Sequence, residues 1–196
     1  MNLTRIDLTR MFAVALLMAT GSSITARAQT ASKPAPPGQP QTFHVCQMTY
    51  ARCVWSPCEG TVVMGNQATT TCQCPVMSNS FSVGANDCKT DAPTATTVKS
   101  RYSPINTYAR CTMKRPWAMC LDSPCTINSD KTTASCTCTL MQDAGDFMYQ
   151  PDKPDQCSSG IVSSATVDDL DTITDYLQTQ DQMPVSNFTV VNQQKK

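Results

Sequence analysis

The chain has 196 residues with 15 basic and 15 acidic side chains, so its formal net charge is zero. It has no basic stripe or arginine cluster, which argues against a nucleic-acid partner. Twelve cysteines set against one histidine and seven glycines indicate a cross-linked scaffold.

Residues 1–28 have the three parts of a secretory signal peptide. Arg5 and Arg10 precede the apolar run 11–20, and Ala26-Arg27-Ala28 is a small-x-small cleavage site. The apolar run is well short of the ~20 residues that a membrane-spanning helix needs. We therefore expect a periplasmic or secreted protein with no membrane span after cleavage, in a compartment where disulfides form.

Residues 29–42 form a proline-rich leader, with prolines at positions 34, 36, 37 and 40. Proline fixes φ and removes a backbone donor, so this stretch is predicted to be extended and exposed.

Two six-cysteine segments follow, at 43–88 and 111–157. In both, Ser-Pro precedes the third cysteine and the fourth and fifth cysteines form Cys-x-Cys, while insertions fall only between cysteines. This pattern predicts an internal duplication into two tandem modules. Each has an even number of cysteines and can close its own bridges, although fifteen pairings per module remain open. The twelve predicted disulfide cysteines are Cys46, Cys53, Cys58, Cys72, Cys74, Cys88, Cys111, Cys120, Cys125, Cys136, Cys138 and Cys157.

Strand-forming residues at 60–64 and 68–74 flank the turn Gly65-Asn66-Gln67, which predicts a β-hairpin. The second segment repeats it at 125–127 and 132–138. A module of about 45 residues has a marginal core, so bridges that contribute on the order of 2–4 kcal/mol each are expected to stabilise it.

Residues 89–110 are predicted to be a solvated linker, and residues 158–196 a tail that contains a helix at about 167–180. Thr166 is the expected N-cap. Val167, Leu170, Ile173 and Leu177 lie on one helical stripe. This stripe needs a partner surface, either the second module or another protein. A last strand is predicted at 188–191.

No catalytic residue or cofactor is predicted. From residue 29 onward the chain has one histidine, His44, and one glutamate, Glu59, with no Gly-x-Ser-x-Gly, glycine-rich phosphate loop or Cys-x-x-Cys. The soft sulfur ligands of cysteine and methionine leave a copper-handling protein as an alternative. Disulfide bonding in an oxidising compartment competes with it, so no metal ligand is assigned.

Large apolar side chains on small disulfide proteins either pack over a bridge or form a binding face. The candidate binding-face residues are Trp55, Trp117, Leu170, Ile173 and Leu177.

The cysteine spacing loosely resembles tandem epidermal-growth-factor-like modules. In that family the first cysteine bonds the third, the second the fourth and the fifth the sixth. The resemblance implies the bridges Cys46–Cys58, Cys53–Cys72 and Cys74–Cys88, then Cys111–Cys125, Cys120–Cys136 and Cys138–Cys157. The segments Trp117–Cys125, Cys136–Cys138 and Ser163–Leu177 are also similar to uncharacterised exported bacterial cysteine-rich proteins, a group that implies export and disulfides but no mechanism.

The sequence thus predicts a small disulfide-rich, mainly β/loop fold of two tandem six-cysteine modules with a C-terminal amphipathic helix. The leading functional hypothesis is a non-enzymatic binding protein of unknown ligand, whose partner is another protein or an envelope component. The alternatives are a periplasmic copper protein and a hydrolase inhibitor that presents the loop 139–156.

Overall fold

The computed structural model describes residues 42–104, 107–112, 115–142, 145–149, 160–179 and 189–193. The predicted signal peptide and all but the last residue of the predicted leader lie outside the described residues. No helix in the described ranges is long and apolar enough to cross a membrane.

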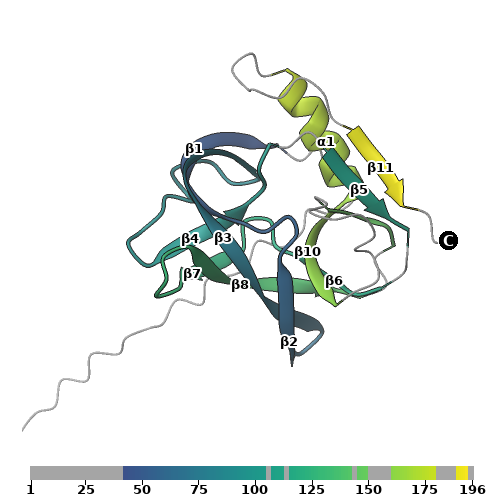
Figure 1. Cartoon of the computed structure of the whole chain (residues 1–196), viewed down its shortest axis with the longest axis horizontal. Helices are drawn as coiled ribbons and strands as arrows, with labels where there is room; N and C mark the ends of the chain where they lie inside the picture. Colours follow the sequence, from purple (N-terminus) through teal and green to yellow (C-terminus); the bar gives the residue numbers. More distant parts are fainter. Residues whose placement is uncertain are drawn as a thin grey trace, which may run out of the picture. The chain divides into compact units, whose positions relative to one another are not determined.

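The described chain is mainly β-structure with one helix, as predicted (Figure 1). The first half contains β1 (His44–Arg52), β2 (Pro57–Met64), β3 (Gln67–Gly84) and β4 (Thr97–Arg101). The second half contains β5 (Thr107–Cys111), β6 (Trp117–Met119), β7 (Pro124–Ile127), β8 (Thr133–Met141), β9 (Phe147–Tyr149), β10 (Ile161–Thr166), α1 (Val167–Gln178) and β11 (Thr189–Gln193). Both predicted hairpins are confirmed, because β2 pairs antiparallel with β3 and β7 pairs antiparallel with β8.

The strand pairings close into two circuits that share the β3–β8 ladder. One circuit runs β3–β8–β6–β10–β2 and returns to β3. The other runs β3–β1–β4–β7–β8 and returns to β3. Strands β9, β5 and β11 continue outward from β10. Since each circuit contains strands from both six-cysteine segments, the two segments form one sheet system.

The repeat seen in the cysteines recurs in the strand pairing. Cys72 and Cys136, the fourth cysteine of each segment, pair with each other across β3 and β8. On one side β4 pairs parallel with β1 and antiparallel with β7. On the other, β10 pairs parallel with β6 and antiparallel with β2. Relative to the cysteines, β6 is equivalent to the end of β1, and β7 is equivalent to β2. Strand β4 of the first half therefore pairs with β7 of the second half, and β10 of the second half pairs with β2 of the first half.

Strand β4 lies inside the stretch 89–110 that the sequence predicts to be a linker. Its main chain is bonded on both edges, since Ser100 pairs with Ala51 of β1 and Val98 pairs with Cys125 of β7. The segment Thr97–Arg101 is therefore part of the sheet and not a solvated connector.

The predicted helix is confirmed as α1. Thr166 is the N-cap, and its hydroxyl oxygen accepts a hydrogen bond from the main-chain N–H of Asp169 at 3.0 Å. Leu170, Ile173 and Leu177 are buried in a core cluster with residues of the sheet. The helix thus packs its apolar stripe inside the protein, against residues of both six-cysteine segments and not against the second module alone. The predicted last strand corresponds to β11, which pairs in parallel with β5.

The disulfide pairing implied by the growth-factor resemblance is wrong. The described bridges are Cys46–Cys88, Cys53–Cys74, Cys58–Cys72, Cys120–Cys138 and Cys125–Cys136. The pattern is nested: first to sixth, second to fifth, third to fourth. Cys58 and Cys72 are direct neighbours across the β2–β3 ladder with a Cα–Cα distance of 4.0 Å, as are Cys125 and Cys136.

Strand pairing in each hairpin places the third and fourth cysteines side by side and so determines the innermost bridge. The bridge between the second and fifth cysteines encloses it in the sequence. Cys111 is also disulfide-bonded, and Cys157 lies outside the described residues. Several bridges of this kind are typical of an oxidising extracellular or periplasmic environment.

Candidate functional site

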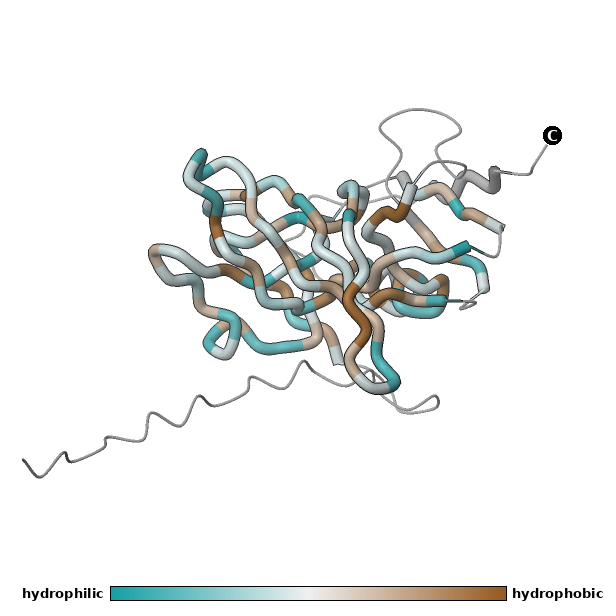
Figure 2. Tube along the Cα trace, turned by 90° about the horizontal axis from the view of Figure 1, so that it is seen from below, coloured by the Kyte–Doolittle hydropathy of each residue, from teal (hydrophilic) through white to brown (hydrophobic). Residues whose placement is uncertain are grey.

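The most exposed apolar side chains of the described chain gather at the end of β2. Val62 is 57% exposed, Val63 is 66% exposed and Met64 is 72% exposed. Figure 2 shows this part of the projecting hairpin as a brown stretch beside its turn. Three consecutive exposed apolar residues are unusual, because a strand with one face on a core alternates buried and exposed positions. We define Val62–Met64 as the hairpin tip.

The outer edge of β2 at the tip is unpaired within the described ranges. Strand β2 pairs with β10 only at Pro57 and Cys58, whereas it pairs with β3 as far as Met64. Beyond Cys58 its outer edge therefore has no partner strand in the described ranges. Such an edge presents main-chain N–H and C=O groups that accept an additional strand.

The base of the hairpin is held firmly. The Cys58–Cys72 bridge links its two strands, and the side-chain hydroxyls of Thr69 and Thr70 donate to the main-chain oxygens of Val62 and Glu59 at 3.4 and 3.2 Å. Strand β3 is in turn paired with β8 from Thr69 to Pro75. The tip is thus presented on a cross-linked support, which lowers the entropy lost on binding.

The hairpin turn is the two-residue loop Gly65-Asn66 between the paired residues Met64 and Gln67. Gly65 has φ +62°, as a type II′ turn requires at its first central position. A bulge between Glu59 and Val62, with Gly60 at φ +70°, adds twist to β2. Because of this turn and this bulge, the tip does not continue the flat surface of the sheet.

The equivalent hairpin of the second half is polar. Its turn contains Asp130, whose carboxylate accepts hydrogen bonds from the main-chain N–H groups of Thr132 and Thr133, both at 2.9 Å. These bonds hold the pKa of Asp130 below its ordinary value. The amide of Asn128 donates to the Thr133 hydroxyl at 2.8 Å. The exposed apolar tip is therefore a feature of one copy only.

The residues that the sequence predicts to form a binding face are buried or half-buried, which corrects that prediction. Trp117 is fully buried and stacks on Phe147 with ring centroids 5.7 Å apart. Leu170, Ile173 and Leu177 are the buried face of α1, and Trp55 is half-buried against the core cluster that contains Trp117. Trp117 lies in a core cluster with second-half residues such as Phe147. The helix residues lie in a different cluster, which also contains Phe43 and Val83 of the first half.

The loop 139–156, predicted to be an exposed inhibitory loop, is only partly described. Its residues Phe147 and Met148 are buried in β9. Asp146 accepts from the guanidinium of Arg110, with an Nη2–Oδ2 distance of 2.6 Å. The described part of this stretch is therefore attached to the sheet.

Four bridges lie in one buried core cluster with residues of both halves, and we call them the sulfur cluster. The Cys53 and Cys136 Sγ atoms are 3.4 Å apart, and those of Cys120 and Cys72 are 3.6 Å apart. Two groups of three sulfurs, each within 4.8 Å, result: Cys53 with Cys125 and Cys136, and Cys72 with Cys120 and Cys138. Every one of these sulfurs is in a disulfide. The contacts are therefore van der Waals contacts, and no thiolate is available to a metal in this oxidation state.

A buried charge cluster lies at the other end of β3. The Arg101 guanidinium is fully buried, with Nη1 2.5 Å from Asp91 Oδ2 and 3.5 Å from Asp122 Oδ1. Its Nη2 donates to the main-chain oxygen of His44 at 2.8 Å. The other Asp122 oxygen accepts from the main-chain N–H of Ala85 at 2.8 Å. The cluster therefore ties the loop that carries Cys88 to β1, β4 and the turn before β7.

Burial and the neighbouring Asp91 charge raise the pKa of Asp122 to about 7, although Arg101 acts in the opposite direction. A carboxyl group of this kind is suited to acid–base chemistry. Asp91, Arg101 and Asp122 are 1%, 0% and 4% exposed, so a substrate has no access to them in this conformation. We interpret the cluster as a structural clamp.

The chain was compared with protein-family models, curated proteins and solved structures, and no match was found in any of the three.

Proposed function

We propose that this protein is an exported, non-enzymatic binding protein that presents the hairpin tip to a partner protein. The observation that carries the proposal is the exposure of Val62, Val63 and Met64 on a cross-linked hairpin, whose outer edge beyond Cys58 has no partner strand among the described residues. The signal pattern of residues 1–28 and the disulfides favour the periplasm or the exterior as the place of action.

The chemistry of the tip indicates the kind of partner. From Gly60 to Cys74 the hairpin contains no charged residue, so charge contributes little to recognition. The free β2 edge offers main-chain hydrogen bonds, and the side chains on either side offer apolar contacts. This combination fits an extended, uncharged apolar strand of another protein that adds to β2.

The proposal is tested with the mature chain and a triple variant, Val62→Ser, Val63→Ser and Met64→Ser. Full burial of a valine or methionine side chain is worth about 1.5–3 kcal/mol, so loss of all three is expected to weaken binding by at least about a hundredfold. Ser129→Ala with Lys131→Ala, on the equivalent polar hairpin, is the matched control and is expected to bind as the parent does.

The partner for this measurement is the protein captured by cross-linking from the tip, purified and titrated against both variants. Equal affinity of the triple variant and the control would refute the proposal. Concentration-dependent dimers in sedimentation would identify a second copy of this chain as the partner instead. Flotation with neutral phosphatidylcholine vesicles would identify lipid as the partner instead.

The copper alternative is favoured by one observation, the two groups of three sulfurs within 4.8 Å. It requires reduction of the bridges, because thiolates are the ligands that select Cu(I). Native mass spectrometry of oxidised and reduced protein with Cu(I) tests it. Retention of copper by the reduced form alone would support the alternative, and no retention by either form would exclude it.

A further inference from the structure

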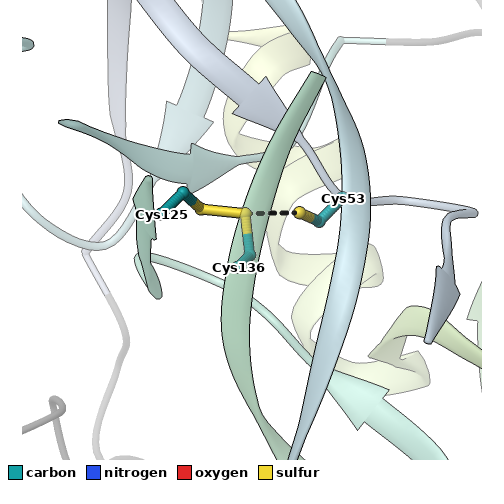
Figure 3. Close-up of side chains that lie close together, drawn as sticks. All are labelled: Cys53, Cys125 and Cys136. Carbon is teal, nitrogen blue, oxygen red and sulfur yellow. Dashed lines mark hydrogen bonds between the residues drawn. A yellow bond between two sulfur atoms is a disulfide. The ribbon is translucent and has the colours of Figure 1, made fainter. Parts of the chain in front are cut away.

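The sulfur cluster contains two contacts between disulfides of different halves. In Figure 3 the Cys53 sulfur faces the Cys136 sulfur, which is bonded to Cys125. Cys53, Cys72, Cys120 and Cys136 are all fully buried. At 3.4 and 3.6 Å these sulfurs touch, so no atom lies between them.

The two contacts are repeat equivalents. Cys53 and Cys120 are the second cysteines of their segments, and Cys136 and Cys72 are the fourth cysteines of the opposite segments. In each contact the second cysteine of one half therefore faces the innermost bridge of the other half. The same arrangement on both sides follows from the symmetric pairing of β3 with β8 about Cys72 and Cys136.

We infer that this cluster is a thiol–disulfide exchange site between the two halves of the chain. A thiol at Cys53 is placed against the disulfide Cys125–Cys136, and a thiol at Cys120 is placed against Cys58–Cys72. Exchange proceeds when a thiolate attacks one sulfur of a disulfide, and its rate depends on access to that sulfur. Contact within the folded protein provides this access without an external thiol at the second step.

The reaction balances as follows. A small dithiol reductant supplies two electrons and two protons and converts Cys53–Cys74 into two thiols, while it is itself oxidised to a disulfide. The Cys53 thiol loses its proton and its sulfur bonds to Cys136 Sγ. The Cys125–Cys136 bond breaks, and Cys125 leaves as a thiolate that takes up a proton. One thiol and one disulfide are consumed and one of each is formed in this second step, while the Cys74 thiol is unchanged, so the step needs no further oxidant.

Exchange converts a bridge within one half into a bridge between the halves. Reduction of the Cys53–Cys74 bridge therefore leaves the two interlocked halves covalently joined through Cys53 and Cys136, and the free thiol moves to Cys125. This property is independent of the hairpin tip and of any partner.

The test uses the mature chain with Cys74→Ser, which leaves Cys53 without its native partner. The folded, air-oxidised protein is quenched in acid, alkylated in denaturant without reduction, and mapped by peptide mass spectrometry. Cys53 and Cys125 are thiols of the same kind, so we expect comparable alkylation at both, together with a new Cys53–Cys136 linked peptide. Alkylation confined to Cys53, with Cys125–Cys136 intact, would overturn the inference.

Two further variants separate exchange from general scrambling. Cys88→Ser leaves Cys46 unpaired, and Cys46 belongs to neither sulfur group, so Cys46 is expected to be the only alkylated residue. Cys53→Ser with Cys74→Ser removes the bridge without a free thiol and is expected to keep Cys125–Cys136. Movement of alkylation to Cys125 in the Cys88→Ser variant as well would show unspecific scrambling and contradict the inference.

If Cys74→Ser fails to fold, the same mapping is carried out on the parent protein after brief exposure to limiting dithiothreitol under native conditions. The linked peptide Cys53–Cys136 or Cys72–Cys120 is expected among the partly reduced species. Native bridges and free thiols alone would overturn the inference.

Discussion

Cys72 and Cys136 pair with each other across the β3–β8 ladder, and the two six-cysteine segments are arranged about this pair with equivalent strand partners on both sides. Strand β4 of the first half pairs with β7 of the second half, and β10 of the second half pairs with β2 of the first half. The two segments therefore form one interlocked sheet system.

The repeat predicts one bridge that the described residues do not include. In the first segment the outermost bridge joins the first and sixth cysteines, Cys46 and Cys88. The equivalent cysteines of the second segment are Cys111 and Cys157. We expect peptide mapping without reduction to find the Cys111–Cys157 pair, and Cys111 linked to any other residue would contradict the repeat.

Gly84 lies against the buried charge cluster. A Cβ atom at this position would lie 2.4 Å from both Arg101 Nη1 and Asp122 Oδ1. Overpacking of this kind costs about 1–3 kcal/mol, so we expect Gly84→Ala to lower the free energy of unfolding in urea by that amount. Thr61→Ala, on the exposed part of β2, is the control and should change it little.

The raised pKa of Asp122 predicts a dependence of stability on pH. A carboxyl group whose pKa is about 7 in the folded state and near 3.8 in the unfolded state binds its proton more tightly when the protein is folded. Its contribution to stability is complete below about pH 4 and is lost as the pH rises through about 7.

We therefore expect this group to lower the free energy of unfolding between pH 4 and pH 7. Asp122→Asn should flatten this part of the profile. Asp175→Asn, an exposed change on α1, serves as control and should retain the slope. A profile of the Asp122→Asn protein that still falls as steeply as that of the parent would show that another group is responsible.

Helix α1 is expected to stabilise the fold through its buried face. Ile173→Ala removes a side chain that is 1% exposed, and such changes cost about 2–5 kcal/mol. Thr172→Ala on the exposed face is the matched control. Thermal unfolding at fixed pH measures both, and a similar small effect of the two substitutions would indicate that the helix is not docked as described.

The local structure of this chain was largely predictable. Glycine and asparagine at 65–66 mark the first hairpin, and Thr166 before an apolar stripe marks the helix. Both signals act over a few residues, so neighbouring side chains are sufficient to specify them.

The arrangement of the halves was not predictable in the same way. Strand β4 has little local signal, and it is specified by its pairing with β1 and β7. The bridge order depends on which cysteines face each other across those ladders. For the same reason the sequence left open whether Trp117 packs over a bridge or forms a binding face. It occupies the position equivalent to Tyr50, and both side chains are buried.

The sequence of the hairpin tip predicts a strand, and its exposure is not evident from local propensity. The first hairpin has thirteen residues between its third and fourth cysteines and the second has ten. The longer hairpin contains Val62-Val63-Met64 where the shorter one has a polar turn. Connections between strands vary more than the strands they join, so the exposed tip depends on a segment that differs between the two copies.

The most direct test of the binding proposal places a photoreactive benzoylphenylalanine at Val63, and in a second protein at Ser129 on the equivalent polar hairpin, in cells that produce the protein. We expect a single adduct of defined mass from position 63, none from position 129, and loss of the adduct when Val62→Ser and Met64→Ser are added. Identical adducts from both positions, or none from position 63, would contradict the account.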